Sequence, residues 1–406
     1  MYQIVMDYIE KNQTELIENV KKLVAIDSTN PGQFEKEAAL ELQTILKQAG
    51  ISFETYEPFE KRVSVLAAMD SAQSEGGLLF NGHLDVVPSG DLSQWQSDPF
   101  KPEIRNGRLY GRGSTDMKGG VAAFAFAMKA VKESQINLKK PVYLHAVADE
   151  ECGGRVGTVL LMQNNMIPKV DMAITGESST FNGEMAVVRT CAGIATIVIK
   201  SWGKPAHASK PHEGINAVMN MARVIVAIQD HFQIPKTQMD PLLPAPTFAV
   251  GTQIKGGIKM NIIPEYCEAL MDLRTNPGMT QESIEYQLRD IIEKVKSVYP
   301  EVNAEAQCSM WDNPTLLSED SFAVKKGKEA IEKAVGYAPV CKMRSGATDA
   351  RFINDLLPCL VAYGPGDALI GNIHGYNESV GIQDLVNWAK AYANLILGVC
   401  GETESM

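Results

Sequence analysis

Strand-like and helix-like hydrophobic patterns alternate through the first 188 residues. Apolar runs typical of strands are followed by stretches with apolar residues at helical spacing, and this order predicts a mostly parallel sheet flanked by helices. The expected strands are Phe53–Tyr56, Val63–Ala68, the run from Leu78, Val142–Ala148 and Met172–Thr175. The expected helices are 1–27, Glu35–Ala49, Val121–Lys132 and Gly157–Asn164, and the pattern returns with Asp320–Val335, the strand Cys359–Tyr363 and a last helix over Ile382–Leu397.

The pattern changes between about Arg189 and Trp311. There the order is strand, helix, two strands, helix and strand, which is typical of a ferredoxin-like α+β unit. We therefore expect a small domain inserted into a larger one, with a first catalytic part over 1–188, the insertion over 189–312 and a second catalytic part over 313–406.

The composition argues against some classes of binding partner. The 406 residues are 45% hydrophobic and carry a formal net charge of -11, without a block of Lys and Arg that could bind phosphates, so no nucleic-acid partner is expected. No apolar run is long enough to span a membrane. The seven cysteines include no Cys-x-x-Cys pair, which favours a reducing cytoplasm and gives no sign of a thiolate zinc site.

Side chains able to bind a metal stand where the predicted strands end. Ligands of open α/β sheets bind beyond the carboxyl ends of the strands, so these side chains are expected to converge there. They are His83, Asp116, Glu151, Glu177 and His374. Each alone is compatible with an inert histidine or a solvated carboxylate, but five at one edge favour a shared site.

Two imidazoles and three carboxylates suit zinc, manganese or cobalt. Five ligands are too many for one catalytic zinc but fit two divalent metals if one carboxylate bridges them, with a bridging water between the metals. Glu150 is then the candidate general base, although Glu150 and Glu151 together could also form a solvated acidic turn. Asp85 lies two residues after His83 on an extended backbone and is expected to orient its ring.

Three motifs carry a family resemblance, and it extends over nearly the whole chain. The motifs are Asn81-Gly82-His83-Leu84-Asp85-Val86-Val87-Pro88, Gly111-Arg112-Gly113-Ser114-Thr115-Asp116-Met117-Lys118-Gly119-Gly120 and Asp149-Glu150-Glu151. They resemble the co-catalytic zinc aminoacylases and peptidases, the family of acetylornithine deacetylase and succinyl-diaminopimelate desuccinylase. The resemblance implies a catalytic domain like that of the zinc exopeptidases and an inserted domain that acts as lid and dimer interface.

The same resemblance implies roles for the metal-binding residues. One metal would bind His83, Asp116 and Glu177, and a second would bind Asp116, Glu151 and His374. Glu150 would be the base and Asp85 would stand behind His83.

In the inserted domain, the resemblance implies that His207 of a partner subunit helps to hold the oxyanion in a homodimer. Asn261 and Arg274 look like substrate contacts, and Gly346 belongs to a turn that resembles one lining the substrate pocket. From the residues alone, His207 would be a surface loop residue, Asn261 a strand-end cap and Arg274 part of a surface ion pair.

The resulting hypothesis is a zinc-dependent amidohydrolase, with cobalt or manganese as alternatives. A metal-bridging hydroxide would remove the acyl group from an N-acyl amino acid such as N-acetylornithine or N-succinyl-diaminopimelate. Family members usually have Glu at the position of Glu177 in deacylases and carboxypeptidases, and Asp in aminopeptidases and dipeptidases. A metallo-carboxypeptidase or dipeptidase acting on a short peptide is the alternative, and a non-catalytic metal-binding or peptide-binding homologue is a third reading.

Overall fold

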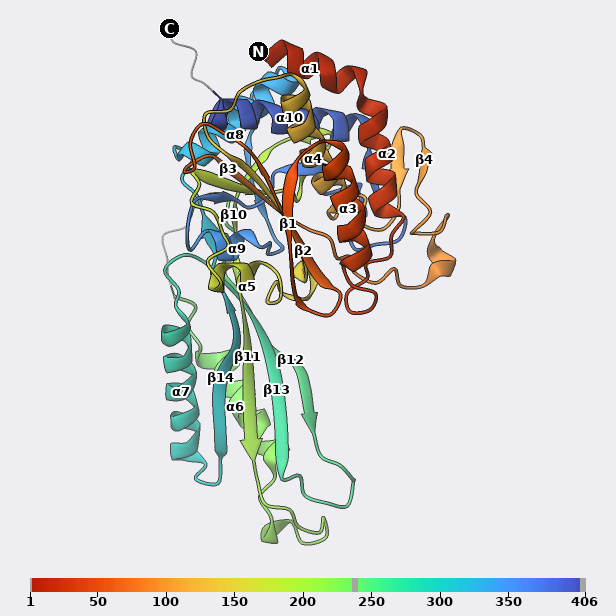
Figure 1. Ribbon diagram of the computed structural model, residues 1–406. Coiled ribbons are helices and arrows are strands. Elements are labelled where there is room, and N and C mark those ends of the chain that lie inside the picture. The colour runs from red at the N-terminus through yellow and green to blue at the C-terminus, as the bar shows by residue number, and fades with distance from the viewer. Residues whose placement is uncertain (1, 236–239, 402–406) are drawn as a thin grey trace. The chain divides into compact units, whose positions relative to one another are not determined.

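The computed structural model describes residues 2–235 and 240–401, which form two compact units (Figure 1). Unit 1 contains the chain up to Thr190, then Leu317–Arg344, and then the chain from Thr348 onward. Unit 2 contains Cys191–Leu316 together with Ser345–Ala347. In the part of the chain that is described, no helix is both long and apolar enough to span a membrane.

A six-stranded sheet forms the centre of unit 1. Its order is β1-β2-β6-β3-β7-β17, and the strands from β6 to β17 run parallel while β1 and β2 are antiparallel. The parallel part agrees with the expected sheet, and the antiparallel pair adds an edge to it. The strands are β1 (Ser52–Phe59), β2 (Arg62–Met69), β3 (Leu78–His83), β6 (Val142–Val147), β7 (Met172–Thr175) and β17 (Cys359–Leu360).

The strand expected over Cys359–Tyr363 is shorter than predicted. It pairs with β7 only as far as Leu360, after which Val361 donates its backbone N–H to Val188. Several further short strands were not predicted, because runs of two to five residues are too short to show the alternation of apolar and polar residues that marks a strand. They are β4 (Glu103–Arg105), β5 (Arg108–Tyr110), β8 (Ser178–Phe181), β9 (Glu184–Met185), β10 (Val187–Cys191), β15 (Thr315–Leu316), β16 (Cys341–Arg344), β18 (Gly364–Asp367) and β19 (Ser379–Gly381).

The single N-terminal helix predicted over 1–27 is wrong, because two helices meet at Asn12. The Asn12 side chain donates to the carbonyl of Tyr8 at 2.8 Å and its backbone leaves the helical region, which is how asparagine competes with helical hydrogen bonds. The helices of unit 1 are α1 (Tyr2–Lys11), α2 (Gln13–Val24), α3 (Lys36–Gln48), α4 (Lys118–Glu133), α5 (Thr158–Gln163), α8 (Phe322–Val335), α9 (Ala350–Ile353) and α10 (Ile382–Cys400).

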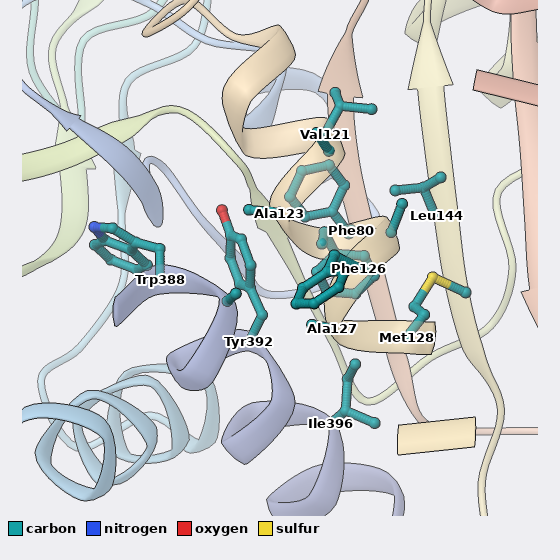
Figure 2. Packing of buried hydrophobic residues seen from close by; sticks show 14 of the residues in the cluster. Phe80, Val121, Ala123, Phe126, Ala127, Met128, Leu144, Trp388, Tyr392 and Ile396 are labelled. Carbon is teal, nitrogen blue, oxygen red and sulfur yellow. The ribbon is translucent and has the colours of Figure 1, made fainter. Parts of the chain in front are cut away.

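The core of unit 1 lies between the sheet and two apolar helices, α4 and α10 (Figure 2). Phe80 of β3 stacks on Phe124 of α4 with ring centroids 4.4 Å apart, and Tyr392 of α10 meets Phe80 edge-on at 5.7 Å. Close packing extends to the backbone, since a Cβ on Gly120 would lie 2.4 Å from the carbonyl oxygen of Gly176. The first turn of α4 is therefore held against the end of β7.

Unit 2 has a four-stranded antiparallel sheet in the order β12-β13-β11-β14. With two helices in the connections, this is the strand order of a ferredoxin-like fold. Alternate residues of β11 are buried against α6 and α7, as the period of two predicts. The elements are β11 (Gly193–Trp202), α6 (Ala217–His231), β12 (Thr247–Gly256), β13 (Tyr266–Thr275), α7 (Gln281–Val298) and β14 (Asn303–Asp312).

Candidate metal centre

The five predicted ligands come together at the carboxyl edge of the parallel strands of unit 1. His83 is the last residue of β3, and Glu177 follows β7 by two positions. Asp116 precedes α4, and Glu151 lies in a 3-10 turn after β6 that also carries Glu150. His374 lies in the loop between β18 and β19, with its side chain half exposed. The short loops thus bring residues from five segments to one place.

Asp116 lies between the two histidines. Its Oδ1 is 3.0 Å from Nε2 of His83, and its Oδ2 is 3.2 Å from Nε2 of His374. Each imidazole has a second carboxylate beside it. His83 Nε2 lies 3.5 Å from Glu177 Oε1. His374 Nε2 lies 3.2 Å from Glu151 Oε2. The site therefore consists of two similar halves that share one carboxylate.

The orientation of His83 leaves Nε2 available as a ligand. Its Nδ1 lies 2.9 Å from the backbone carbonyl oxygen of Asp85, which can only accept, so Nδ1 carries a proton. The neutral ring then has its lone pair on Nε2, facing Asp116 and Glu177. This is the tautomer that a metal-binding histidine needs.

The Asp85 carboxylate contacts more than the His83 ring. It is 3.5 Å from Nδ1, farther than the Asp85 carbonyl oxygen. It accepts the backbone N–H groups of Glu150 and Glu151, both at 3.2 Å, and the side-chain amide of Asn30 at 2.8 Å. Asp85 therefore holds the turn that carries the candidate base as well as the histidine.

A second layer supports the same turn. Arg62 binds Glu35 at 2.9 Å and Asp149 at 2.7 Å, and Asp149 has a left-handed backbone with φ 74°. Burial, together with the nearby Asp85 charge, raises the pKa of Glu35 to about 7 against the lowering effect of Arg62. The motifs gave no signal for Arg62 or Glu35, because both come from elements far from the turn in sequence.

The charges of the centre shift the pKa of both histidines. Burial lowers the pKa of His83, but hydrogen bonds to Asp116, Asp85 and Glu177 outweigh it and raise that pKa well above its ordinary value. The hydrogen bonds of His374 to Asp116 and Glu151 raise its pKa to about 10. In Asp116 burial opposes ionisation, yet the two histidines hold its pKa well below the usual range.

The pKa values of the two glutamates of the 3-10 turn are raised, in contrast to that of Asp116. Burial, followed by the charges of Asp349, Glu177 and Glu151, raises the pKa of Glu150 well above its ordinary value despite the nearby His83. Burial and the Asp116 charge raise the pKa of Glu151 to about 7. Burial is the larger cause of both shifts, and the neighbouring carboxylates add to it.

Arg344 is a residue of this centre that the sequence did not reveal. It ends β16, and its Nη1 lies 2.9 Å from Glu177 Oε2 as an ion pair. No motif surrounds it, and only the chain's return beside β10 brings it to the site.

The centre fits divalent cations. His83, Asp116 and Glu151 offer ligand atoms within 4.8 Å of one another, and so do His83, Glu150 and Glu177. Glu151 Oε1 is buried without a hydrogen-bond partner among the described residues, which is costly unless a cation is bound there. Four carboxylates around two imidazoles and one guanidinium form a site of hard oxygen and nitrogen donors.

The other predicted site residues belong to unit 2. His207 is exposed and pairs with Ile262 across an isolated bridge, so it lies beside the exposed Asn261. Arg274 forms an ion pair with Asp272 at 2.8 Å, the arrangement that its residue type alone suggested. Gly346 lies in an exposed bend after β16.

Comparison with known proteins decides the family. The model of the peptidase family M20/M25/M40 matches residues 79–398, which include all five candidate ligands and the inserted unit. This chain belongs to that family. Members of this family are metal-dependent hydrolases, and one solved member, the YXEP protein of Bacillus subtilis, is a dinuclear metal-binding peptidase.

Among curated M20-type relatives, the chain is 30% identical over 327 residues to the succinyl-diaminopimelate desuccinylase of Thioalkalivibrio sulfidiphilus, covering 80% of this chain and 84% of the relative. It is 25% identical over 422 residues to the N-formyl-4-amino-5-aminomethyl-2-methylpyrimidine deformylase of Bacillus subtilis, covering 97% and 96%. The M20 family metallo-carboxypeptidase Sso-CP2 from Sulfolobus solfataricus has the same fold, with a TM-score of 0.74, 21% identity and coverage of 94% and 98%.

Proposed function

We propose that this M20 hydrolase is an N-deacylase that removes a small acyl group from the amine of an amino acid or a related compound. The observation that carries this proposal is the position of Asp116, whose two carboxylate oxygens each face a different histidine at 3.0 and 3.2 Å. A shared carboxylate between two His–carboxylate pairs is the donor set of a two-metal hydrolase.

Two divalent metals, zinc in the first place and cobalt or manganese as alternatives, fit these residues. His83, Asp116 and Glu177 would hold one metal, and Asp116, Glu151 and His374 would hold the other. Bound there, the metals would polarise the amide carbonyl. They would also lower the pKa of a bound water molecule, so that it can lose a proton at neutral pH and attack as hydroxide.

Glu150 supplies the proton transfer. Its half-buried carboxylate, with a pKa raised by desolvation and by neighbouring acids, takes a proton from the attacking water and gives it to the departing amine. The products are the free acid and the free amine, so water is the only co-substrate. The Asp85 carboxylate keeps the Glu150 turn in place through two backbone hydrogen bonds.

His207 of the partner subunit is proposed to stabilise the oxyanion in a homodimer formed through unit 2. The backbone N–H of Ser209 donates to Nδ1 of His207 at 3.1 Å. Because Nδ1 accepts that bond, the proton of the neutral ring sits on Nε2, which is then a donor at the exposed end of the side chain. Asn261, Arg274 and the backbone around Gly346 are proposed to bind the substrate's carboxylate.

Glu177 and the relatives support a deacylase over an aminopeptidase. A glutamate at this ligand position is usual for deacylases and carboxypeptidases of the family. The named relatives include a desuccinylase and a deformylase, which differ in acyl group and in amine. A metallo-carboxypeptidase is the second candidate, because the Sulfolobus enzyme shares the fold over nearly the whole chain.

A hydrolysis screen tests the proposal. The metal-free protein is loaded with zinc, cobalt or manganese and offered N-formyl, N-acetyl and N-succinyl amino acids alongside dipeptides with free and blocked amino termini. We expect cleavage of N-acyl compounds, with little cleavage of free dipeptides. Preferential cleavage of N-blocked dipeptides would favour the carboxypeptidase, and a requirement for a free amino terminus would contradict both.

A further inference from the structure

A buried ion pair lies beside the candidate metal centre without contributing to it directly. Arg112 Nη1 and Glu378 Oε2 are 2.5 Å apart, and their side chains are 1% and 0% exposed. Arg112 belongs to the glycine-rich segment before α4, and Glu378 to the loop before β19. The two residues are 266 positions apart in the chain, so the pair joins two segments that only the fold brings together.

Glu378 uses its carboxylate to hold the backbone of the Asp116 segment. Its Oε1 accepts the N–H of Thr115 at 2.9 Å and of Asp116 itself at 3.0 Å, and its Oε2 accepts the N–H of Gly113 at 3.1 Å. Three backbone donors on one buried carboxylate fix the path of the chain immediately before the shared ligand. The position of the Asp116 carboxylate follows from that path.

Arg112 completes the connection to the other histidine. Its Nη2 donates to the carbonyl of Gly375 at 3.2 Å, one residue after His374, and lies 3.4 Å from the carbonyl oxygen of Pro88. Its guanidinium also lies over the ring of Trp95 at 5.3 Å. One planar side chain thus binds the loop of His374, the segment after Asp85 and Glu378.

We propose that Arg112 and Glu378 are a positioning pair that sets the distance between Asp116 and His374. The pair thereby controls the affinity for the second metal, the one that Asp116, Glu151 and His374 would bind. This inference rests on the proposed function. The half of the site formed by Asp116, Glu151 and His374 depends on both loops that the pair joins. The half formed by His83, Asp116 and Glu177 depends on only one of them, because β3 and β7 place the other two ligands.

The contacts of the pair distinguish this role from general stabilisation. Every hydrogen bond of Glu378 described above goes to Arg112 or to the backbone between Gly113 and Asp116. Outer partners of metal ligands typically change metal affinity by about 10-fold to 100-fold when they are replaced. We expect a change of that size at one metal and a much smaller change at the other.

The experiment titrates cobalt into the metal-free wild type, Glu378→Gln and Arg112→Lys. Stoichiometry and affinity are measured by calorimetry, and coordination by the visible absorption of bound cobalt. Glu378→Gln keeps the shape of the side chain but replaces one carboxylate oxygen with an NH2 group, which faces the N–H donors of Arg112 or of the backbone. Arg112→Lys keeps the positive charge but loses the planar guanidinium that binds several acceptors at once. Both are expected to bind the first cobalt within about 3-fold of wild type, and the second about 10-fold to 100-fold more weakly.

The matched control is Asp171→Asn. Asp171 is another carboxylate that accepts a backbone N–H, from Gly77 at 2.8 Å, and pairs with a cation, Lys140 at 2.8 Å. It precedes β7 and lies beside the residue before β3, at the opposite ends of those strands from His83 and Glu177. Its replacement is expected to leave both cobalt affinities and the absorption spectrum unchanged, whatever it costs in stability.

The outcomes separate the two proposals. If the wild type binds no pair of metals, the proposed function fails. If the wild type binds two metals and folded variants bind both as tightly, or lose both equally, the positioning role is wrong. Failure of both variants to fold would also overturn it, because the pair would then serve the fold as a whole. With a cleaved substrate in hand, kcat is expected to fall while KM stays within about 3-fold.

Discussion

Glu150 and Glu151 are neighbours in one 3-10 turn, and the proposal gives them different roles, Glu150 as the base and Glu151 as a metal ligand. Glu150→Gln keeps the shape and the backbone bond to Asp85, so metal binding should persist while kcat falls by about 100-fold to 10,000-fold. Glu151→Gln should instead weaken metal binding, because Oε2 of Glu151 faces His374. Metal content and kcat of both variants check the assignment. Normal turnover of Glu150→Gln would contradict the assignment of Glu150 as the base.

His145 of β6 gives the fold a pH dependence. It is 3% exposed, and burial lowers its pKa to about 4 from the ordinary 6.5. Between these values the unfolded chain binds more protons than the folded one, so stability falls as the pH drops through this window. From pH 7 to pH 5 this imidazole should contribute a loss of about 2 kcal/mol.

His145→Phe, which cannot be protonated, tests that effect. The free energy of unfolding is measured in urea at both pH values for the variant and the wild type, so that titrations common to the two proteins cancel. The variant is expected to lose less stability at pH 5. Equal losses in the two proteins would contradict the role of His145.

At the scale of elements, the contact between α4 and the end of β7 controls both fold and site. Gly120→Ala places a methyl group 2.4 Å from the carbonyl oxygen of Gly176, so the first turn of α4 must move. We expect a loss of about 1–3 kcal/mol in stability and weaker metal binding, because Asp116 precedes this turn. Thermal unfolding and metal titration measure the two effects.

Gly398 provides the matched comparison. It lies inside α10, and a Cβ there would meet no atom within 4 Å. Gly398→Ala should therefore stabilise the protein by about 0.5–1 kcal/mol through its effect on helix propensity. If both alanine variants were equally stable, the close approach at Gly120 would not be the constraint inferred here.

For the whole molecule, all five candidate ligands and Glu150 belong to unit 1. Leu317 donates its N–H to the carbonyl of Arg189 at 3.0 Å, so the chain leaves and re-enters unit 1 at neighbouring points. Replacing residues 191–316 by a short glycine linker should leave a folded protein that binds two metals. Turnover should fall strongly, because His207, Asn261 and Arg274 are removed.

Circular dichroism, metal stoichiometry and kcat are the measurements for this deletion. Undiminished turnover would show that unit 2 contributes nothing to catalysis. Loss of metal binding in a folded protein would show that the ligand set is incomplete without it.

The sequence by itself determined the sheet of unit 1, the ferredoxin-like order of unit 2 and the set of residues to consider for a metal site. These features can be predicted because they depend on residues that are close together in the sequence. Apolar periodicity reports which face of a helix or strand is buried, and in an α/β fold polar residues at strand ends share one edge. All five candidate ligands, from His83 to His374, could be chosen on that basis, and the family resemblance then divided them between two metals.

Only the tertiary structure decided how those residues are supported. Arg344 beside Glu177, Arg62 beside Asp149, and the pair of Arg112 and Glu378 join segments that are far apart in sequence. A buried charge must find its partner in space, and periodicity along the chain carries no information about which distant residue that will be. For the same reason the pairing of β10 with β16, whose residues are far apart in the chain, emerged only in the folded structure.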